Sequence, residues 1–225
     1  MMRNVPVWID DTPIREFPKL QKNISVDVLV VGAGVTGITV AYLLKKAGST
    51  VALIERERVA SIDTGHTTAH LTYVTDVGLQ QLVRNFGKDH AQAAWDAGAA
   101  AINEIERIVE EERIECEFAR VPAYVHVRTG RFSKKEASSL KREADFAAKL
   151  GFDAAYLNSA PYFNLPAVRF ANQAKFHPRK YLRSLVAKIP GSGSHVFSKK
   201  APPVNSMRRS AALRLTAPGS VSIAW

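Results

Sequence analysis

The chain has a single cysteine, Cys116, among its 225 residues, and this scarcity excludes several kinds of protein. One thiol allows no intramolecular disulfide and no thiol redox pair, and there is no local Cys/His cluster to hold zinc or an iron–sulfur centre. Long apolar runs are also missing. No stretch approaches about 18 successive apolar residues, and the first residues lack the apolar region of a signal peptide. We therefore expect a cytoplasmic protein with no bound metal and no membrane contact.

Acidic residues are missing from the last third of the chain. All 21 Asp and Glu lie at or before Asp153, whereas residues 154–225 carry 11 Lys and Arg. The formal net charge of +10 is therefore wholly C-terminal. Such a charge suggests an anionic partner, but a segment selected to bind nucleic acid would concentrate its basic residues. Beyond Lys200 the only basic residues are Arg208, Arg209 and Arg214. We accordingly predict no nucleic-acid partner.

The clearest motif is a glycine-rich turn between a strand and a helix. VDVLVV (Val26–Val31) is typical of a buried parallel strand, and Gly32, Gly34 and Gly37 follow in the spacing G-x-G-x-x-G. A helical pattern and a second strand, TVALIE (residues 50–55), complete a β–turn–α–β unit. In such a unit the first glycine permits the tight turn and the second lets the main chain approach a pyrophosphate. The third lets the helix pack closely on the strand.

The residues around the turn predict how a dinucleotide is held. The N–H groups of Val35 and Thr36 belong to the helix N-terminus, where free donors and the helix dipole favour a phosphate. Glu55 ends the second strand, where a carboxylate accepts hydrogen bonds from the ribose hydroxyls and disfavours a 2′-phosphate. A lone glycine motif would indicate only a tight turn, but here the surrounding pattern is complete. The motif by itself does not separate FAD from NAD.

A polar loop follows the second strand. SIDTGHTTAH (residues 61–70) suits the ribityl and phosphate oxygens of a cofactor, because it places several hydroxyl and imidazole groups directly after a nucleotide-binding strand. The alternative is that Thr64 or Thr67 only caps a following helix. The hydroxyl and imidazole side chains of the loop are those of Ser61, Thr64, His66, Thr67, Thr68 and His70.

These segments carry a resemblance to a known family. VDVLVVGAGVTGITVAYLLKKAG and VALIER resemble the N-terminal FAD-binding unit of the D-amino-acid oxidase and glycine oxidase superfamily. VWIDDTPIREFPKL and DTGHTTAHLT resemble a bacterial branch whose members commonly carry a C-terminal Rieske [2Fe–2S] domain. The resemblance implies FAD as the cofactor. By position, it also implies cofactor contacts from Arg56, Thr64, Gly65 and His66.

The resemblance further implies a fold and an organisation. The fold expected is α/β, with a Rossmann-like FAD-binding βαβ unit and a partial α+β substrate domain, incomplete at the C-terminal side. The resemblance covers residues 1–199, and two explanations compete for the rest: a shifted frame or truncated gene, which we favour, and a disordered basic tail. The expected segments are an FAD-binding unit (1–75), helices and a partial substrate-domain sheet (76–175), a helix and strand returning to the FAD domain (176–200), and an aberrant or disordered tail (201–225).

Three further segments predict local structure. KDHAQAAWDAGAAAINEIERIVEEERI is a packing helix in which Trp95 and Gly98 share the apolar stripe. FARVPAYVHVRTG (residues 118–130) has strand composition with a break at Pro122. SKKE is a capping box at a helix start, and His177 with Pro178 begins another helix, followed by a strand in SHVFSKK.

By resemblance, the chemistry is oxidation of a C–N bond in a small-molecule amine or amino acid, with hydride transfer to flavin N5. The residues identify neither the substrate nor the electron acceptor, and we nominate no catalytic residue. A chain this short is expected to be inactive or impaired. One alternative is a non-catalytic nucleotide-binding remnant. An NAD-dependent enzyme is disfavoured by the flavin-like segment after Glu55.

Overall fold

The computed structural model describes residues 5–128, 133–198, 212–217 and 220–224. Backbone contacts divide the chain into two units. The four segments expected from the sequence stay a prediction. Unit 1 comprises Met1–Thr68, Ile114–Cys116 and His177–Trp225, and unit 2 comprises Ala69–Arg113 and Glu117–Phe176.

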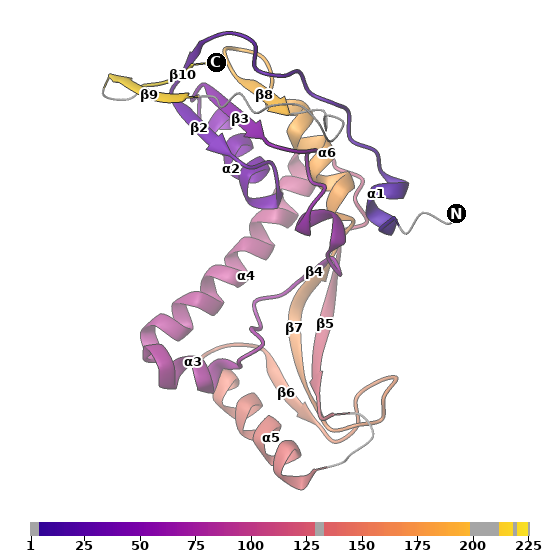
Figure 1. Ribbon diagram of the computed structural model, residues 1–225. Helices are drawn as coiled ribbons and strands as arrows, with labels where there is room; N and C mark the ends of the chain where they lie inside the picture. Colours follow the sequence, from indigo (N-terminus) through magenta and orange to yellow (C-terminus); the bar gives the residue numbers. More distant parts are fainter. Residues whose placement is uncertain (1–4, 129–132, 199–211, 218–219, 225) are drawn as a thin grey trace, which may run out of the picture. The chain divides into compact units, whose positions relative to one another are not determined.

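Unit 1 is built on a parallel sheet of three strands. Its order is β2 (Val28–Val31), β3 (Val51–Glu55) and β8 (His195–Ser198). Helix α2 (Val35–Lys46) connects β2 to β3 and contacts both strands, and α6 (Pro178–Lys188) packs on α2 (Figure 1). This arrangement confirms the α/β class and the predicted βαβ unit. The strand predicted in SHVFSKK is β8, and residues 199–200 of that segment lie outside the described residues.

The prediction of one buried strand over Val26–Val31 is wrong. The run divides at Asp27 into β1 (Ile24–Val26) and β2. The Asp27 carboxylate accepts hydrogen bonds from the backbone N–H and the hydroxyl of Thr50, both at 2.7 Å, which pulls this residue out of the strand. Among the described residues β2 pairs with β3 alone, and Val31 at its end is 70% exposed. The polar residue inside the run therefore marks a real break.

Two strands occur within the segment 201–225. β9 (Ala212–Ala217) and β10 (Ser220–Ala224) pair antiparallel, and β10 also pairs antiparallel with β1. The register places Ile24 opposite Ile223. Residues 201–211 lie outside the described part of the chain, and the interpretation of the segment as an aberrant or disordered tail stays a prediction.

Unit 2 is an antiparallel sheet with helices. β7 (Ala167–Lys175) pairs with β4 (His70–Leu71), β5 (Ala119–His126) and β6 (Ala154–Leu157). The break predicted at Pro122 is confirmed, because the pairing of β5 with β7 shifts register between Val121 and Ala123. The helices of unit 2 are α3 (Leu79–Phe86), α4 (Lys88–Glu111) and α5 (Lys134–Lys149).

The core of unit 2 is aromatic. Trp95 on α4 is fully buried, and its ring centroid lies 5.1 Å from that of Phe152 and 5.6 Å from that of Phe170. Gly98, one turn later, allows the close approach predicted for it: a Cβ there would lie 2.8 Å from Cβ of Tyr73. The helix is therefore a packing element, as its apolar stripe indicates.

The predicted helix starts are confirmed. The Ser133 hydroxyl accepts from the backbone N–H of Glu136 at 3.3 Å and begins α5. His177 caps α6: its Nδ1 accepts from the N–H of Lys180 at 3.3 Å, and Pro178 occupies the first turn.

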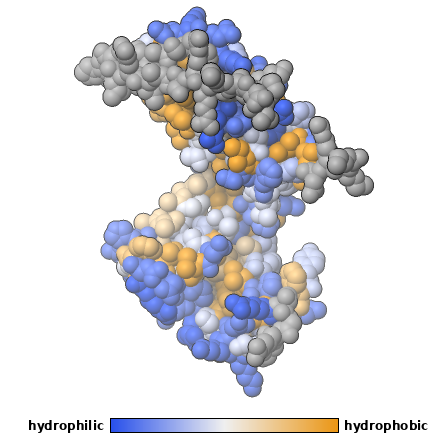
Figure 2. Space-filling model, viewed as in Figure 1, coloured by the Kyte–Doolittle hydropathy of each residue, from blue (hydrophilic) through white to orange (hydrophobic). Residues whose placement is uncertain are grey.

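The described surface has apolar patches but no membrane helix. On the viewed face of unit 2 hydrophobic patches lie between larger hydrophilic areas (Figure 2), and exposed aromatic residues of this unit include Phe86 and Tyr162. None of the helices in the described ranges combines the length and the apolar composition needed to cross a membrane.

Candidate dinucleotide site

The glycine turn between β2 and α2 has the geometry that its motif predicts. Gly32 has φ +97°, in the region that favours glycine, and its N–H donates to the carbonyl of Ile54 at 2.8 Å. A Cβ on Gly37 would lie 1.8 Å from the carbonyl oxygen of Gly32, so the first turn of α2 can pack on the turn only without a side chain at residue 37. Each of these two glycines is therefore required by the backbone path itself.

The N-terminus of α2 meets the polar loop. Gly34 is the N-cap of the helix and has no side chain that could accept from the first-turn donors, which include the N–H groups of Val35 and Thr36. The Thr64 hydroxyl accepts from the N–H of Val35 at 3.2 Å. Thr64 thus contacts the first turn of α2 from the distant loop, instead of capping a helix that follows it in sequence.

Glu55, at the end of β3, is hydrogen-bonded to the glycine turn. One carboxylate oxygen accepts from the N–H of Ala33 and the other from the N–H of Glu57, both at 2.8 Å. A carboxylate has about four acceptor directions, so capacity remains for the ribose hydroxyls that this residue is predicted to bind. The bond to Ala33, which the sequence does not indicate, also makes Glu55 a support of the glycine turn.

The loop after β3 folds into the short 3-10 helix η1 (Asp63–His66). Gly65 is buried in it, and a Cβ there would lie 2.8 Å from Cδ1 of Ile9. His66 is exposed, and its Nδ1 donates to the carbonyl of Ile62 at 2.7 Å. Arg56 is exposed directly after Glu55. All of the predicted cofactor-binding residues therefore belong to unit 1, on three neighbouring stretches of chain.

Residues outside the predicted set complete the site. The N–H of Ala60, a non-glycine residue with φ +50°, donates to the carbonyl of Ala33 at 2.9 Å. Trp8, on helix α1 (Val7–Asp11), donates from Nε1 to the carbonyl of Thr67 at 2.7 Å. The motif gives no signal for either contact, because both join residues that are far apart in sequence. The segment VWIDDTP could have drawn attention to Trp8 only through the family resemblance.

The donor set suits a dinucleotide. The helix N-terminus offers N–H groups for a pyrophosphate, the missing side chain at Gly34 lets a ligand approach the main chain, and the carboxylate of Glu55 can accept from a ribose. Within the described residues there is no group of three or more His, Cys, Asp or Glu that could hold a metal ion. The chemistry of the donors therefore favours a nucleotide cofactor over a metal.

One histidine of unit 2 is held by two contacts. His126, on β5, stacks on Phe163 with ring centroids 4.7 Å apart, and its Nδ1 donates to the carbonyl of Val127 at 2.7 Å. These two interactions account for the position of the ring.

Comparison with known proteins identifies the family behind this geometry. The model of the family described as FAD dependent oxidoreductase matches residues 27–220, past residue 199 where we expect the resemblance to end. A relative named for a Rieske 2Fe-2S iron–sulfur centre, YhfW of Bacillus subtilis (strain 168), is 34% identical over 197 residues, which cover 85% of this chain and 37% of that protein. These findings confirm the predicted resemblance, and FAD is the cofactor of the family.

Solved structures share the fold. Glycine oxidase from Bacillus cereus is 20% identical with a TM-score of 0.52, over 77% of this chain and 47% of the enzyme. L-amino acid deaminase from Proteus vulgaris is 15% identical with a TM-score of 0.58, over 90% of this chain and 46% of that chain. The chain therefore spans less than half the length of these relatives.

Proposed function

Because this chain belongs to the family of FAD dependent oxidoreductases, we propose that it is the FAD-binding part of an enzyme that oxidises a C–N bond. The substrate is a small amine or amino acid, and hydride passes from its carbon to flavin N5. The observation that carries the proposal is the β2–turn–α2–β3 unit, in which Gly37 packs on Gly32 and Glu55 lies beside the turn. The names of the two structural relatives, an oxidase and a deaminase of amino acids, support this substrate class.

The residues of this chain bind and orient the cofactor. The N-terminus of α2, with Gly34 and the N–H of Thr36, holds the pyrophosphate, and Glu55 accepts from the ribose hydroxyls. Thr64, Gly65 and His66 contact the ribityl side. When bound, FAD supplies the two-electron acceptor of the reaction.

The first test is the visible absorbance spectrum of the purified chain before and after addition of excess FAD and desalting. We expect retained bands near roughly 370 and 450 nm, which arise from the flavin that carries the chemistry. A matched sample receives excess NAD together with the FAD. A folded chain that retains no FAD would contradict the proposal and favour the non-catalytic remnant, whereas competition of NAD for the site would favour an NAD-dependent enzyme.

The substrate class is tested on the FAD-loaded chain without oxygen. Amino acids and simple amines are added singly, and the band near roughly 450 nm is followed for loss of absorbance on flavin reduction. Because a chain this short is expected to be impaired, slow bleaching by at least one amine, and by none of the matching alcohols, is the expected result. If FAD is retained but no amine or amino acid bleaches it, this chain does not itself oxidise a C–N bond, and the non-catalytic remnant is favoured.

A further inference from the structure

Arg179 is a buried charge to which the dinucleotide motif assigns no role. It lies in the first turn of α6, is 5% exposed, and its burial lowers the pKa of the guanidinium. Its Nε donates to the carbonyl of Thr12 at 2.9 Å, and one terminal nitrogen donates to the carbonyl of Ala60 at 2.6 Å. In the part of the chain that the structure describes, no carboxylate forms an ion pair with Arg179. Its charge is therefore met by main-chain carbonyls from two distant segments.

The contact with Ala60 leads directly to the glycine turn. Ala60 has a left-handed backbone, and its N–H donates to the carbonyl of Ala33 inside the G-x-G-x-x-G turn. On its other side, Ala33 donates from its N–H to Glu55. One residue of the turn, Ala33, is therefore held at both its backbone N–H and its carbonyl, and Arg179 holds Ala60, which provides one of these two partners.

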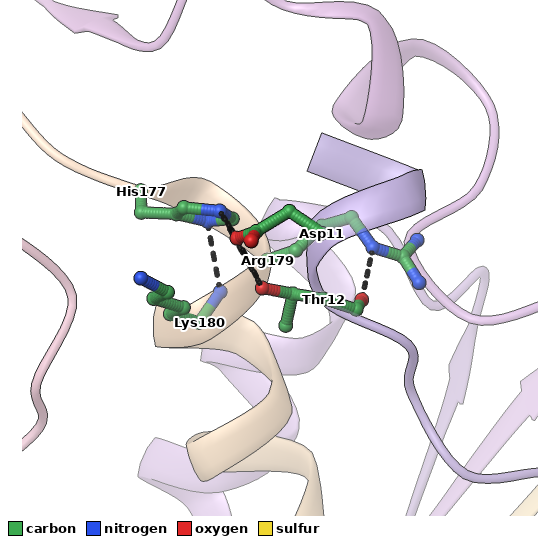
Figure 3. Close-up of polar contacts among 5 residues, drawn as sticks. All are labelled: Asp11, Thr12, His177, Arg179 and Lys180. Atoms are coloured by element: carbon green, nitrogen blue, oxygen red, sulfur yellow. Dashed lines mark hydrogen bonds and ion pairs between the residues drawn. The ribbon is translucent and has the colours of Figure 1, made fainter. Parts of the chain in front are cut away.

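The contact with Thr12 leads to the polar loop. Thr12 ends α1, and that helix carries Trp8, which donates to Thr67, and Ile9, which fills the space beside Gly65. Figure 3 shows the same segment joined to α6 a second time: Nε2 of His177 lies 2.9 Å from Oδ2 of Asp11 and 3.4 Å from the hydroxyl of Thr12. Helix α6 thus holds α1, and α1 holds the loop.

Only arginine can make both contacts in this way. The planar guanidinium offers donors in fixed, diverging directions, so one side chain reaches two carbonyls at once. Lysine keeps the charge but presents a single ammonium. Burying a charge opposes folding unless its donors are satisfied, so both carbonyl bonds are needed at this position.

We propose that Arg179 is a positioning residue of the dinucleotide site: by joining the carbonyls of Thr12 and Ala60, it sets the glycine turn and the loop Asp63–Thr67 in the arrangement that binds FAD. The identity of the ligand rests on the proposed function. The positioning of the turn and the loop does not, and it can be measured without cofactor.

The test compares the full chain with three variants. Arg179→Met removes the donors, Arg179→Lys keeps the charge, and Arg183→Met changes an exposed arginine on the same helix as the matched control. Two quantities are measured: the FAD dissociation constant by flavin fluorescence, and amide hydrogen exchange around Ala33 and Ala60 without FAD. We expect Arg179→Met to weaken FAD binding at least tenfold and to speed exchange at Ala60. Arg179→Lys, whose single ammonium cannot join both carbonyls, should not restore the affinity, and Arg183→Met should change neither quantity.

The outcomes separate this proposal from the proposed function. If Arg179→Met binds FAD within twofold of the original chain, or Arg179→Lys restores full affinity, the positioning role is wrong. If Arg179→Met does not fold, Arg179→Lys alone decides by the same criterion. If the unchanged chain binds no FAD, the proposed function fails. Amide exchange then decides this proposal, with faster exchange at Ala60 in the Arg179 variants supporting it and unchanged exchange overturning it.

Discussion

The interiors of the two units differ in chemistry. In unit 2 the buried side chains packed with Trp95 are aromatic or aliphatic, and Gln173 is the one buried polar residue among the described residues of this unit. In unit 1 the buried polar residues are Thr12, His177, Arg179, Ser194 and Ser198. Unit 1 thus combines a parallel sheet with buried hydrogen bonds, whereas unit 2 combines an antiparallel sheet with an aromatic core.

The difference in chemistry corresponds to a difference in role: buried hydrogen bonds fix the position of the backbone, whereas apolar packing mainly adds stability. Apolar packing is not directional and tolerates small shifts, but a buried hydrogen bond has a narrow geometry and is costly to leave unmade. The polar contacts of unit 1 join segments that are distant in sequence; Ser194, for example, accepts from the N–H of Val51 at 3.0 Å. They hold the backbone around the nucleotide turn in one arrangement. In unit 2 the hydrophobic core provides stability.

The largest expected effect is on the aromatic core of unit 2. Trp95→Ala should lower the free energy of unfolding by about 3–5 kcal/mol, because it removes a fully buried indole and leaves a cavity. Chemical denaturation followed by near-ultraviolet circular dichroism measures the loss. Trp95→Phe, which keeps an aromatic ring, is the milder control. A loss below about 1 kcal/mol would show that the core of unit 2 repacks and that the contrast between the units is overstated.

The next largest effect is on the glycine turn of unit 1. Gly37→Ala should cost about 1–3 kcal/mol of stability and abolish FAD retention, since its Cβ overlaps the Gly32 carbonyl at 1.8 Å. In Gly34→Ala the new Cβ lies 3.2 Å from the Thr64 hydroxyl, so this variant should lose less stability. Its FAD retention should still fall, because the Cβ would stand where the pyrophosphate approaches the main chain. Thermal melting and FAD retention after desalting measure the two variants side by side, and an equal loss of stability in the two would contradict the close approach at residue 37.

A smaller effect is expected at a polar contact of unit 2. The Glu143 carboxylate accepts from the backbone N–H groups of Leu79 and Gln80, and so caps α3 from another helix. Glu143→Ala should cost about 1 kcal/mol, the usual value of a lost N-terminal cap. Glu143→Gln, which keeps one acceptor, should lose less. The denaturation midpoint measures both, and full stability of Glu143→Ala would mean that water replaces the cap.

The smallest expected effect is a dependence of the stability on pH, which arises from one carboxylate in each unit. Hydrogen bonds from His177 and then Thr12 lower the pKa of Asp11, and the hydrogen bond from Arg120 lowers the pKa of Glu106 in unit 2. A lowered folded-state pKa gives a stabilisation that is present above the unfolded pKa and lost as the pH falls through the folded value.

We therefore expect Asp11→Asn to be less stable than the original chain near pH 6, with the difference vanishing as the pH falls below 3.8, the ordinary value for Asp. Glu106→Gln should likewise be less stable than the original chain near pH 6, with the difference vanishing as the pH falls below 4.5, the ordinary value for Glu. Denaturation midpoints across this range are the measurement, and parallel pH profiles for variant and original chain would refute it.

Local patterns predicted most of the elements. The glycine spacing, the helix N-cap at Ser133 and the Pro178 helix start depend on neighbouring residues, and the structure confirms each of them. The prediction failed where a polar side chain met a distant partner: Asp27 interrupts an apolar run because it bonds to Thr50. A local pattern does not include the distant partner Thr50, so the pattern of Val26–Val31 predicts one continuous strand.

The amino-acid sequence by itself determined the class of the fold and the nucleotide turn, because both depend on short-range spacing of glycines, apolar residues and one carboxylate, and the resemblance of its segments to known sequences indicated the family. The tertiary structure alone decided that Arg179, Thr12 and Ala60 meet behind that turn. Their separation in sequence is large, and the bonds go to main-chain carbonyls, which every residue possesses. Only the folded backbone therefore shows which carbonyls a buried charge can reach.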